Sequence, residues 1–226
     1  DPAQLLLGER ATPESLEQMR QRLGLDQPLI VQYGRYIQRI VTQGDFGISI
    51  KTNNPVLEEI AHKFPATIEL ALASMLIATV IGISMGILAA VYRNSWIDHV
   101  SMVGALTGVS MPIFLLGFFF ILLFSSTLGW LPLSGRVDTA LTLTMDFKPI
   151  THFYLLDSLL RQNWLIFKDV CLHLILPAIT LATVPTAIIA RMTRASMLEV
   201  LEQDYIKTAY AKGVKQFKVI MHHAFK

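Results

Sequence analysis

The chain has 226 residues, of which 53% are hydrophobic and only 16% are charged, and its mean hydropathy is +0.49. Soluble globular domains carry about a quarter of charged residues, so this composition excludes an ordinary soluble domain. The single cysteine excludes an intrachain disulfide and a cysteine-cluster metal site. We therefore predict an all-α fold, a polytopic membrane helix bundle.

Residues 1–66 form the first segment, which we expect to contain amphipathic helices. Thr12 and Pro13 are typical of an N-cap and a first helical residue, and Gly24 of a helix end. A second helix is predicted after Pro28, with a regular apolar stripe of the kind that lies on a surface or a membrane interface. The stripe consists of Leu29, Ile30, Tyr33, Tyr36, Ile37, Ile40 and Val41.

Further along this segment, the composition of residues 44–47 predicts a turn. Pro55 favours the start of a short amphipathic helix, and Pro65 is expected to end it, because proline removes a backbone donor. Thr67 would then cap the next helix.

Residues 67–91 contain one charged residue, Glu69, and are predicted to span the membrane, for which about 20 apolar residues suffice. Glu69 lies near one end of this span, where a carboxylate is favoured by the helix N-terminus; the alternative is a side chain that faces the transport path. Small residues recur at three- and four-residue spacing, which lets another helix approach closely. These are Ala71, Ser74, Ala78, Gly82, Gly86 and Ala89.

Residues 92–101 form a short link, and residues 102–128, which carry no charge, form a second predicted span. A kink is expected near Met111 and Pro112. Residues 129–170 follow, with balanced charges and a predicted interfacial helix over 150–167. Within and beside this segment, His152 and His173 are imaginable nickel ligands, but they have no partnered cluster.

Residues 171–190 form the third predicted span; they include Pro177 and Pro185, which membrane helices tolerate. Cys171 reads as a small apolar helix residue. Residues 191–226 are too polar to span. Here a short helix is expected to end at Gly213, and an amphipathic helix follows with the stripe Phe217, Ile220, Met221 and Ala224.

Positive charge orients the chain, because cytoplasmic loops hold the excess of lysine and arginine. Residues 191–226 hold seven such residues against three acids, whereas residues 129–170 hold four against four. We therefore place 191–226 and 92–101 in the cytoplasm, and 1–66 and 129–170 outside. Because an outside segment would begin the chain without a leader, we expect an internal fragment of a longer protein.

The C-terminal loop resembles the coupling loop of ABC importer permeases, whose pattern is Glu-Ala-Ala, three residues, then Gly; Lys207, Thr208, Ala209 and Gly213 occupy the matching positions, so the acid is missing. Further strings at 44–49, 110–114, 129–132 and 176–179 also resemble the dipeptide, oligopeptide and nickel branch of that family. The resemblance implies a type I importer permease in a bacterial inner membrane, with multiple spans, that moves dipeptides or short oligopeptides.

The resemblance also implies partners: a second permease subunit, two cytoplasmic ABC ATPase subunits, a periplasmic peptide-binding protein and membrane lipid. No nucleic-acid partner, cofactor, metal site or catalytic residue is expected. The residues implied to couple the chain to the ATPase are Asp204, Tyr205, Thr208, Ala209, Ala211, Lys212 and Gly213. Those assigned to the translocation path are Glu69, Ser110, Pro112, Phe114 and Pro177.

The chain has no Gly-x-x-x-x-Gly-Lys-Ser/Thr string, so it would not itself hydrolyse ATP, and no His-Glu-x-x-His or Gly-x-Ser-x-Gly string, which argues against a membrane hydrolase. Three alternatives stay open. The chain could import nickel chelates or glutathione; it could be a piece of a secondary transporter or channel, although Glu69 is the only acid inside a predicted span; or it could be a membrane-anchored structural or receptor protein.

Overall fold

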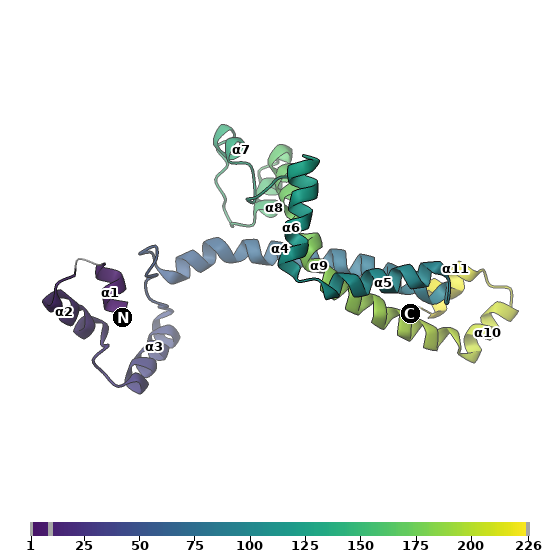
Figure 1. Cartoon of the computed structure of the whole chain (residues 1–226), viewed down its shortest axis with the longest axis horizontal. Helices are drawn as coiled ribbons and strands as arrows, with labels where there is room; N and C mark the ends of the chain where they lie inside the picture. Colours follow the sequence, from purple (N-terminus) through teal and green to yellow (C-terminus); the bar gives the residue numbers. More distant parts are fainter. Residues whose placement is uncertain (1, 9–10, 225–226) are drawn as a thin grey trace. The chain divides into compact units, whose positions relative to one another are not determined.

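The computed structural model describes residues 2–8 and 11–224. Over these ranges the regular structure is helical, and the β-structure is limited to one isolated antiparallel bridge between Ile48 and Pro55. The all-α prediction is therefore confirmed. Figure 1 shows the helices in chain order. They are α1 (Pro2–Leu7), α2 (Pro13–Leu23), α3 (Leu29–Gln43), α4 (Val56–Val91), α5 (Trp96–Ser110), α6 (Ile113–Phe120), η1 (Ile121–Thr127), α7 (Thr139–Thr144), α8 (Tyr154–Leu160), α9 (Trp164–Leu201), α10 (Asp204–Ala211), α11 (Gln216–Lys218) and η2 (Val219–Ala224).

The chain divides into two units, residues 1–65 and 66–226. In the first unit, the predicted helix ends of α2 are confirmed: the Thr12 hydroxyl accepts a hydrogen bond from the Ser15 backbone N–H, and Gly24 adopts φ +69°. Helix α3 presents its apolar stripe to the surface, with Leu29 82% and Val41 77% exposed. Its exposed face agrees with a helix that lies against a membrane interface.

Helix α4 runs without interruption through Pro65, so the prediction that a short helix ends there, with Thr67 capping a new one, was wrong. Proline in a helix interior removes one backbone donor, but neighbouring helix formers can carry the helix past that single missing bond. The predicted span 67–91 is therefore the later part of a helix that begins at Val56.

Helix α4, which continues from the first unit into the second, and α9 are long and apolar enough to cross a membrane, and α5 with α6–η1 adds a third span if the bent pair is counted as one. The bend at Met111 and Pro112 is 106°, so the predicted kink is confirmed in position but is a break between two helices. Helices α5, α6 and α8 all pack against α9, which is therefore the central helix of the second unit (Figure 1).

Helix α9 contains one predicted span and corrects another prediction. It extends from Trp164 to Leu201 and so continues well beyond both ends of the predicted span 171–190. The predicted interfacial helix over 150–167 was wrong, because α8 ends at Leu160 and the Asn163 side chain caps α9 by accepting from the Ile166 N–H at 3.2 Å. A side chain that caps a helix fixes a boundary that apolar spacing alone does not reveal.

Two of the small residues of α4, Gly82 and Gly86, face α9, so a close approach of another helix, which the spacing predicted, is confirmed at these two positions. A Cβ added to Gly82 would lie 2.9 Å from the Ile189 Cβ, and one added to Gly86 would lie 2.6 Å from the Thr193 Cβ. Gly82 and Gly86 are four residues apart and lie on one face, so they form a small-residue contact that brings two helix backbones close together.

Candidate functional site

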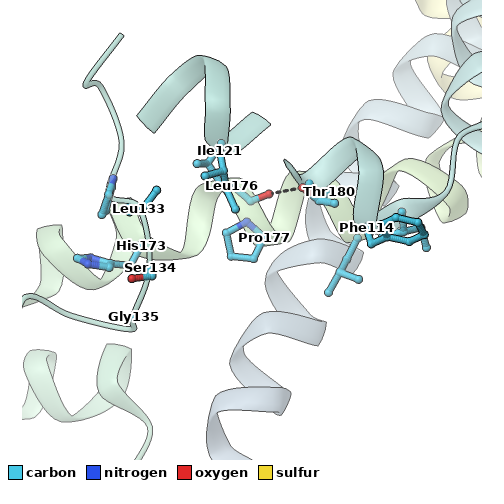
Figure 2. A pocket seen from close by; sticks show the side chains of 13 residues that line it. Phe114, Ile121, Leu133, Ser134, Gly135, His173, Leu176, Pro177 and Thr180 are labelled. Carbon is cyan, nitrogen blue, oxygen red and sulfur yellow. Dashed lines mark hydrogen bonds between the residues drawn. The ribbon is translucent and has the colours of Figure 1, made fainter. Parts of the chain in front are cut away.

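A cavity of about 440 Å³ opens between α6, α9 and the loop that follows η1. Figure 2 shows that one side is formed by successive turns of α9, with the Leu133–Gly135 stretch beside it. The lining residues are Ile113, Phe114, Gly117, Ile121, Pro132, Leu133, Ser134, Gly135, His173, Leu176, Pro177, Thr180 and Leu181.

The lining of this cavity is mostly apolar and contains no lysine, arginine or acidic residue. Its side chains with polar atoms are Ser134, His173 and Thr180. The Thr180 hydroxyl donates to the Leu176 carbonyl at 2.7 Å (Figure 2), and the Nδ1 of His173 donates to the Asp169 carbonyl at 2.8 Å. Because the Thr180 hydroxyl and the Nδ1 of His173 already bond within α9, the wall that α9 contributes to the cavity is mostly apolar.

The five residues assigned to the translocation path from the sequence lie at three different places in the structure. Phe114 and Pro177 line the cavity together, from α6 and α9. Ser110 and Pro112 lie at the break before α6, where the Ser110 hydroxyl donates back to the Leu106 carbonyl at 2.9 Å. Glu69 is not a lining residue.

Glu69 instead forms a buried polar junction with the segment between η1 and α9. Its side chain is 8% exposed and forms an ion pair with Arg136 at 2.8 Å. It also accepts a hydrogen bond at 2.8 Å from the backbone N–H of Leu155, in the first turn of α8. Arg136 lies 3.8 Å above the Tyr154 ring and donates to the His152 carbonyl at 3.0 Å.

This geometry corrects one interpretation of Glu69. The helix N-terminus that attracts its carboxylate belongs to α8, because α4 begins thirteen residues earlier, at Val56. Sequence reasoning did not identify Arg136 as the partner of Glu69, because nothing in a single sequence links two positions that are 67 residues apart.

Neither histidine of the nickel hypothesis belongs to a metal cluster. His173 is bonded to Asp169, and no group of three histidine, cysteine or acidic side chains that could hold a metal lies within residues 2–8 and 11–224.

The C-terminal loop has an outer and an inner face. Asp204, Tyr205, Thr208, Ala211 and Lys212 are exposed on α10 and the turn that follows it, and Gly213 adopts φ +74° there. Ala209, in contrast, is only 9% exposed and packs against a buried cluster with Ile206. Tyr205 and Ala209, four residues apart on α10, therefore differ in exposure: Tyr205 is 53% exposed, whereas Ala209 packs within the chain.

The apolar stripe after Gly213 was also predicted incompletely. Ile220 and Ala224 are buried, but Phe217 is 75% and Met221 39% exposed, and Val219 is fully buried instead. The reason is that Val219–Ala224 form a π-helix, in which backbone bonds join residues five apart, so a 3.6-residue period assigns the wrong face.

A second buried ion pair joins α5 to α9. Arg194 donates to both oxygens of Asp98, at 2.7 Å each, and the Asp98 side chain is 5% exposed. Asp98 also accepts from the Asn94 backbone N–H at 3.0 Å. Sequence reasoning missed this pair; the spacing of Ser95 and Asp98, which resembles a capping box, was the available signal for Asp98.

Comparison with known proteins covers nearly the whole chain. Residues 82–226 match the family described as binding-protein-dependent transport system inner membrane component, and residues 1–71 match the N-terminal region of such membrane components. The probable D,D-dipeptide transport system permease protein DdpB of Escherichia coli (strain K12) is 49% identical over 227 residues, which is 99% of this chain. The di/tripeptide transport system permease protein DppB of Pseudomonas aeruginosa (strain UCBPP-PA14) is 47% identical over all of it.

A more distant relative is the glutathione transport system permease protein GsiC of Shigella flexneri serotype 5b (strain 8401), which is 41% identical over the full chain. The chain spans 65% of DdpB, 66% of DppB and 63% of GsiC. The family model matches more than half of the chain, and DdpB is 49% identical over 99% of it. The chain therefore belongs to the family of binding-protein-dependent transport system inner membrane components.

Proposed function

We propose that this chain is part of the permease subunit of an ABC importer that moves dipeptides or short oligopeptides across a bacterial inner membrane. The observation that carries the substrate class is the 47–49% identity to dipeptide and di/tripeptide permeases. The identity to the glutathione permease is lower, at 41%. Glutathione is itself a modified tripeptide, so it is the second candidate substrate.

In this proposal the cavity beside α6 and α9 belongs to the translocation path. A transported molecule must enter a path and leave it again, which requires weak contacts on the way. The mostly apolar wall around Phe114 and Pro177 meets that requirement, because it holds no lysine, arginine or acidic residue that would trap the termini of a peptide. A second permease subunit would enclose the other side of the path.

The exposed face of α10 is then the contact with a cytoplasmic ATPase. Tyr205, Thr208 and Lys212 are exposed there, although the Tyr205 hydroxyl also donates to the His223 carbonyl at 3.5 Å, and Gly213 follows the end of the helix. The segment between η1 and α9 would lie outside and receive a peptide-binding protein. Nucleotide-driven closure of two ATPase subunits would move α10 and, through it, the spans.

The direct test is reconstitution of the full-length permease with its second permease subunit, two ATPases and binding protein in proteoliposomes. We expect uptake of a labelled dipeptide that requires both ATP and binding protein, with unlabelled tripeptide, glutathione and a nickel chelate compared as competitors. Uptake driven by an ion gradient without ATP would replace this proposal with a secondary transporter.

Replacing Gly213 with valine is expected to uncouple uptake from ATP hydrolysis. At φ +74° a β-branched residue costs about 1–2 kcal/mol, so the turn after α10 should reorganise. No atom lies within 4 Å of an added Cβ, so membrane insertion should be unaffected. Asparagine, which tolerates this backbone conformation, is the control and should retain most uptake. Normal uptake by Gly213→Val would refute the coupling assignment.

Filling the cavity is expected to slow uptake. The variant Ser134→Phe would place a ring in the cavity and should lower the uptake rate about tenfold. A tenfold change corresponds to a free-energy difference of ~1.4 kcal/mol. The matched control is Leu143→Phe in α7, where the side chain is 81% exposed and outside the cavity. Equal uptake rates for the two variants would remove the cavity from the path.

A further inference from the structure

The ion pair between Asp98 and Arg194 has the geometry of a fixed joint. Arg194 uses two nitrogens, Nε and Nη2, to bind the two carboxylate oxygens, at 2.7 Å each. Such a two-point contact fixes orientation as well as distance, which a single hydrogen bond does not. The Arg194 side chain is 26% exposed and Asp98 is nearly buried, so solvent screens the pair little.

The same carboxylate also holds the turn between α4 and α5. Asn94, which adopts φ +63°, donates its backbone N–H to Asp98, and Ser95 caps α5. Asp98 therefore connects three elements at one point: the turn between α4 and α5, the first turn of α5, and α9 through Arg194.

On the other side of this point, the C-terminal loop packs as a block. Ala90 of α4 and Met197 of α9 share one buried cluster with Ile206 and Ala209 of α10. Val219, Ile220 and Ala224 of η2 complete that cluster. A displacement of α10 must therefore carry the end of α9, and Arg194 with it, because packed interiors do not deform continuously.

We propose that Asp98 and Arg194 are positioning residues that transmit movement of the C-terminal loop to α5. Helix α5 leads across the break at Met111 and Pro112 into α6, which carries Phe114 to the cavity. The pair thus lies on the physical connection between the face assigned to the ATPase and the cavity assigned to the path. This inference rests on the proposed function.

A buried ion pair contributes little to stability compared with apolar residues of similar size, so stability alone does not account for a pair at this place. This principle separates transmission from simple anchoring. Replacing both residues by neutral ones of similar volume should leave the fold intact, whereas the orientation that the two-point contact imposes would be lost.

The experiment compares Asp98→Asn, Arg194→Lys and the double variant Asp98→Asn with Arg194→Met in the reconstituted full transporter. The readouts are assembled complex, thermal unfolding, ATP hydrolysis and peptide moved per ATP hydrolysed. The control is Arg93→Gln, which removes the nearby exposed pair of Arg93 with Glu202, whose side chains are 55% and 72% exposed.

We expect the double variant to assemble and unfold like the wild type but to move at least about fivefold less peptide per ATP, the lower end of usual coupling between sites. Arg194→Lys, which keeps the charge and loses the second hydrogen bond, should fall between it and the wild type. Arg93→Gln should stay within about twofold of the wild type, as exposed pairs contribute little.

Two results would overturn the inference. If the double variant moves as much peptide per ATP hydrolysed as the wild type, the ion pair is dispensable. If uptake and the amount of assembled complex fall in equal proportion, the ion pair only anchors the fold. Absence of any ATP-dependent uptake by the wild-type transporter is the separate result that refutes the proposed function, and this inference with it.

Discussion

Replacing Gly86 with alanine is expected to lower the stability of the chain by about 1–3 kcal/mol, the usual cost of an overpacked contact. The added Cβ would lie 2.7 Å from the Ala190 carbonyl oxygen and 2.6 Å from the Thr193 Cβ. Both belong to α9, and a backbone oxygen cannot rotate away as a side chain does. Helices α4 and α9 would have to separate, and Gly82 would lose its contact as well.

The matched control is Gly104→Ala in α5, where no atom lies within 4 Å of the new Cβ. Alanine there should leave stability unchanged or raise it by up to about 1 kcal/mol through its higher helix propensity. Unfolding of both variants in mixed detergent micelles measures the difference. Equal stability of the two variants would show that α4 and α9 do not approach as closely as the structure has them.

Replacing Glu69 with alanine is expected to destabilise the chain by about 2–4 kcal/mol, because a half-buried cation and a backbone donor both lose the buried carboxylate that binds them. Arg136 would keep the His152 carbonyl and the Tyr154 ring as partners but lose its carboxylate, and the Leu155 N–H would lose its acceptor. Glu69→Gln should cost less, since its amide oxygen can still accept from Leu155.

Hydrogen exchange along residues 129–163 tests this directly, because the loss should open that segment locally before the helices unfold. Lys148→Ala is the control: it removes an exposed ion pair with Asp146 in the same segment, whose side chains are 76% and 81% exposed. An exchange pattern in Glu69→Ala identical to that of the control would mean that Glu69 does not hold the segment.

The sequence predicted best those features that short-range chemistry decides. Thr12 and Gly24 mark the ends of α2, the spacing of Gly82 and Gly86 predicted a close helix contact, and Pro112 marked the break in the second span. Each of these depends on a backbone conformation or a steric limit that a few neighbouring residues determine.

Long-range partners and relative helix energies were beyond the reach of a single sequence. Pro65 was predicted to end a helix, but α4 continues through it from Val56 to Val91. Arg136 and Arg194 carry no local sign of the acids they bind, 67 and 96 residues away. The π-helix at Val219 shifted the buried face by departing from the period that the prediction assumed.

The residues of the candidate site were also predicted only in part, because their positions depend on long-range contacts. Phe114 and Pro177 lie together in the cavity, but Glu69 serves a different junction. On α10, Tyr205 and Thr208 are exposed as a contact surface requires, whereas Ala209 is used within the chain. Which side of an exposed helix meets its own chain depends on residues far along the sequence.

The break between α5 and α6 has a consequence for what surrounds it. The last carbonyls of α5 and the first N–H groups of α6 have no partner within their helices, and Pro112 has no N–H to offer. Hydrocarbon cannot hydrogen-bond these groups, so irregular backbone at membrane depth occurs only beside protein or water. Backbone without helical partners at the bend near Met111 therefore has to lie beside protein or water and not against lipid tails.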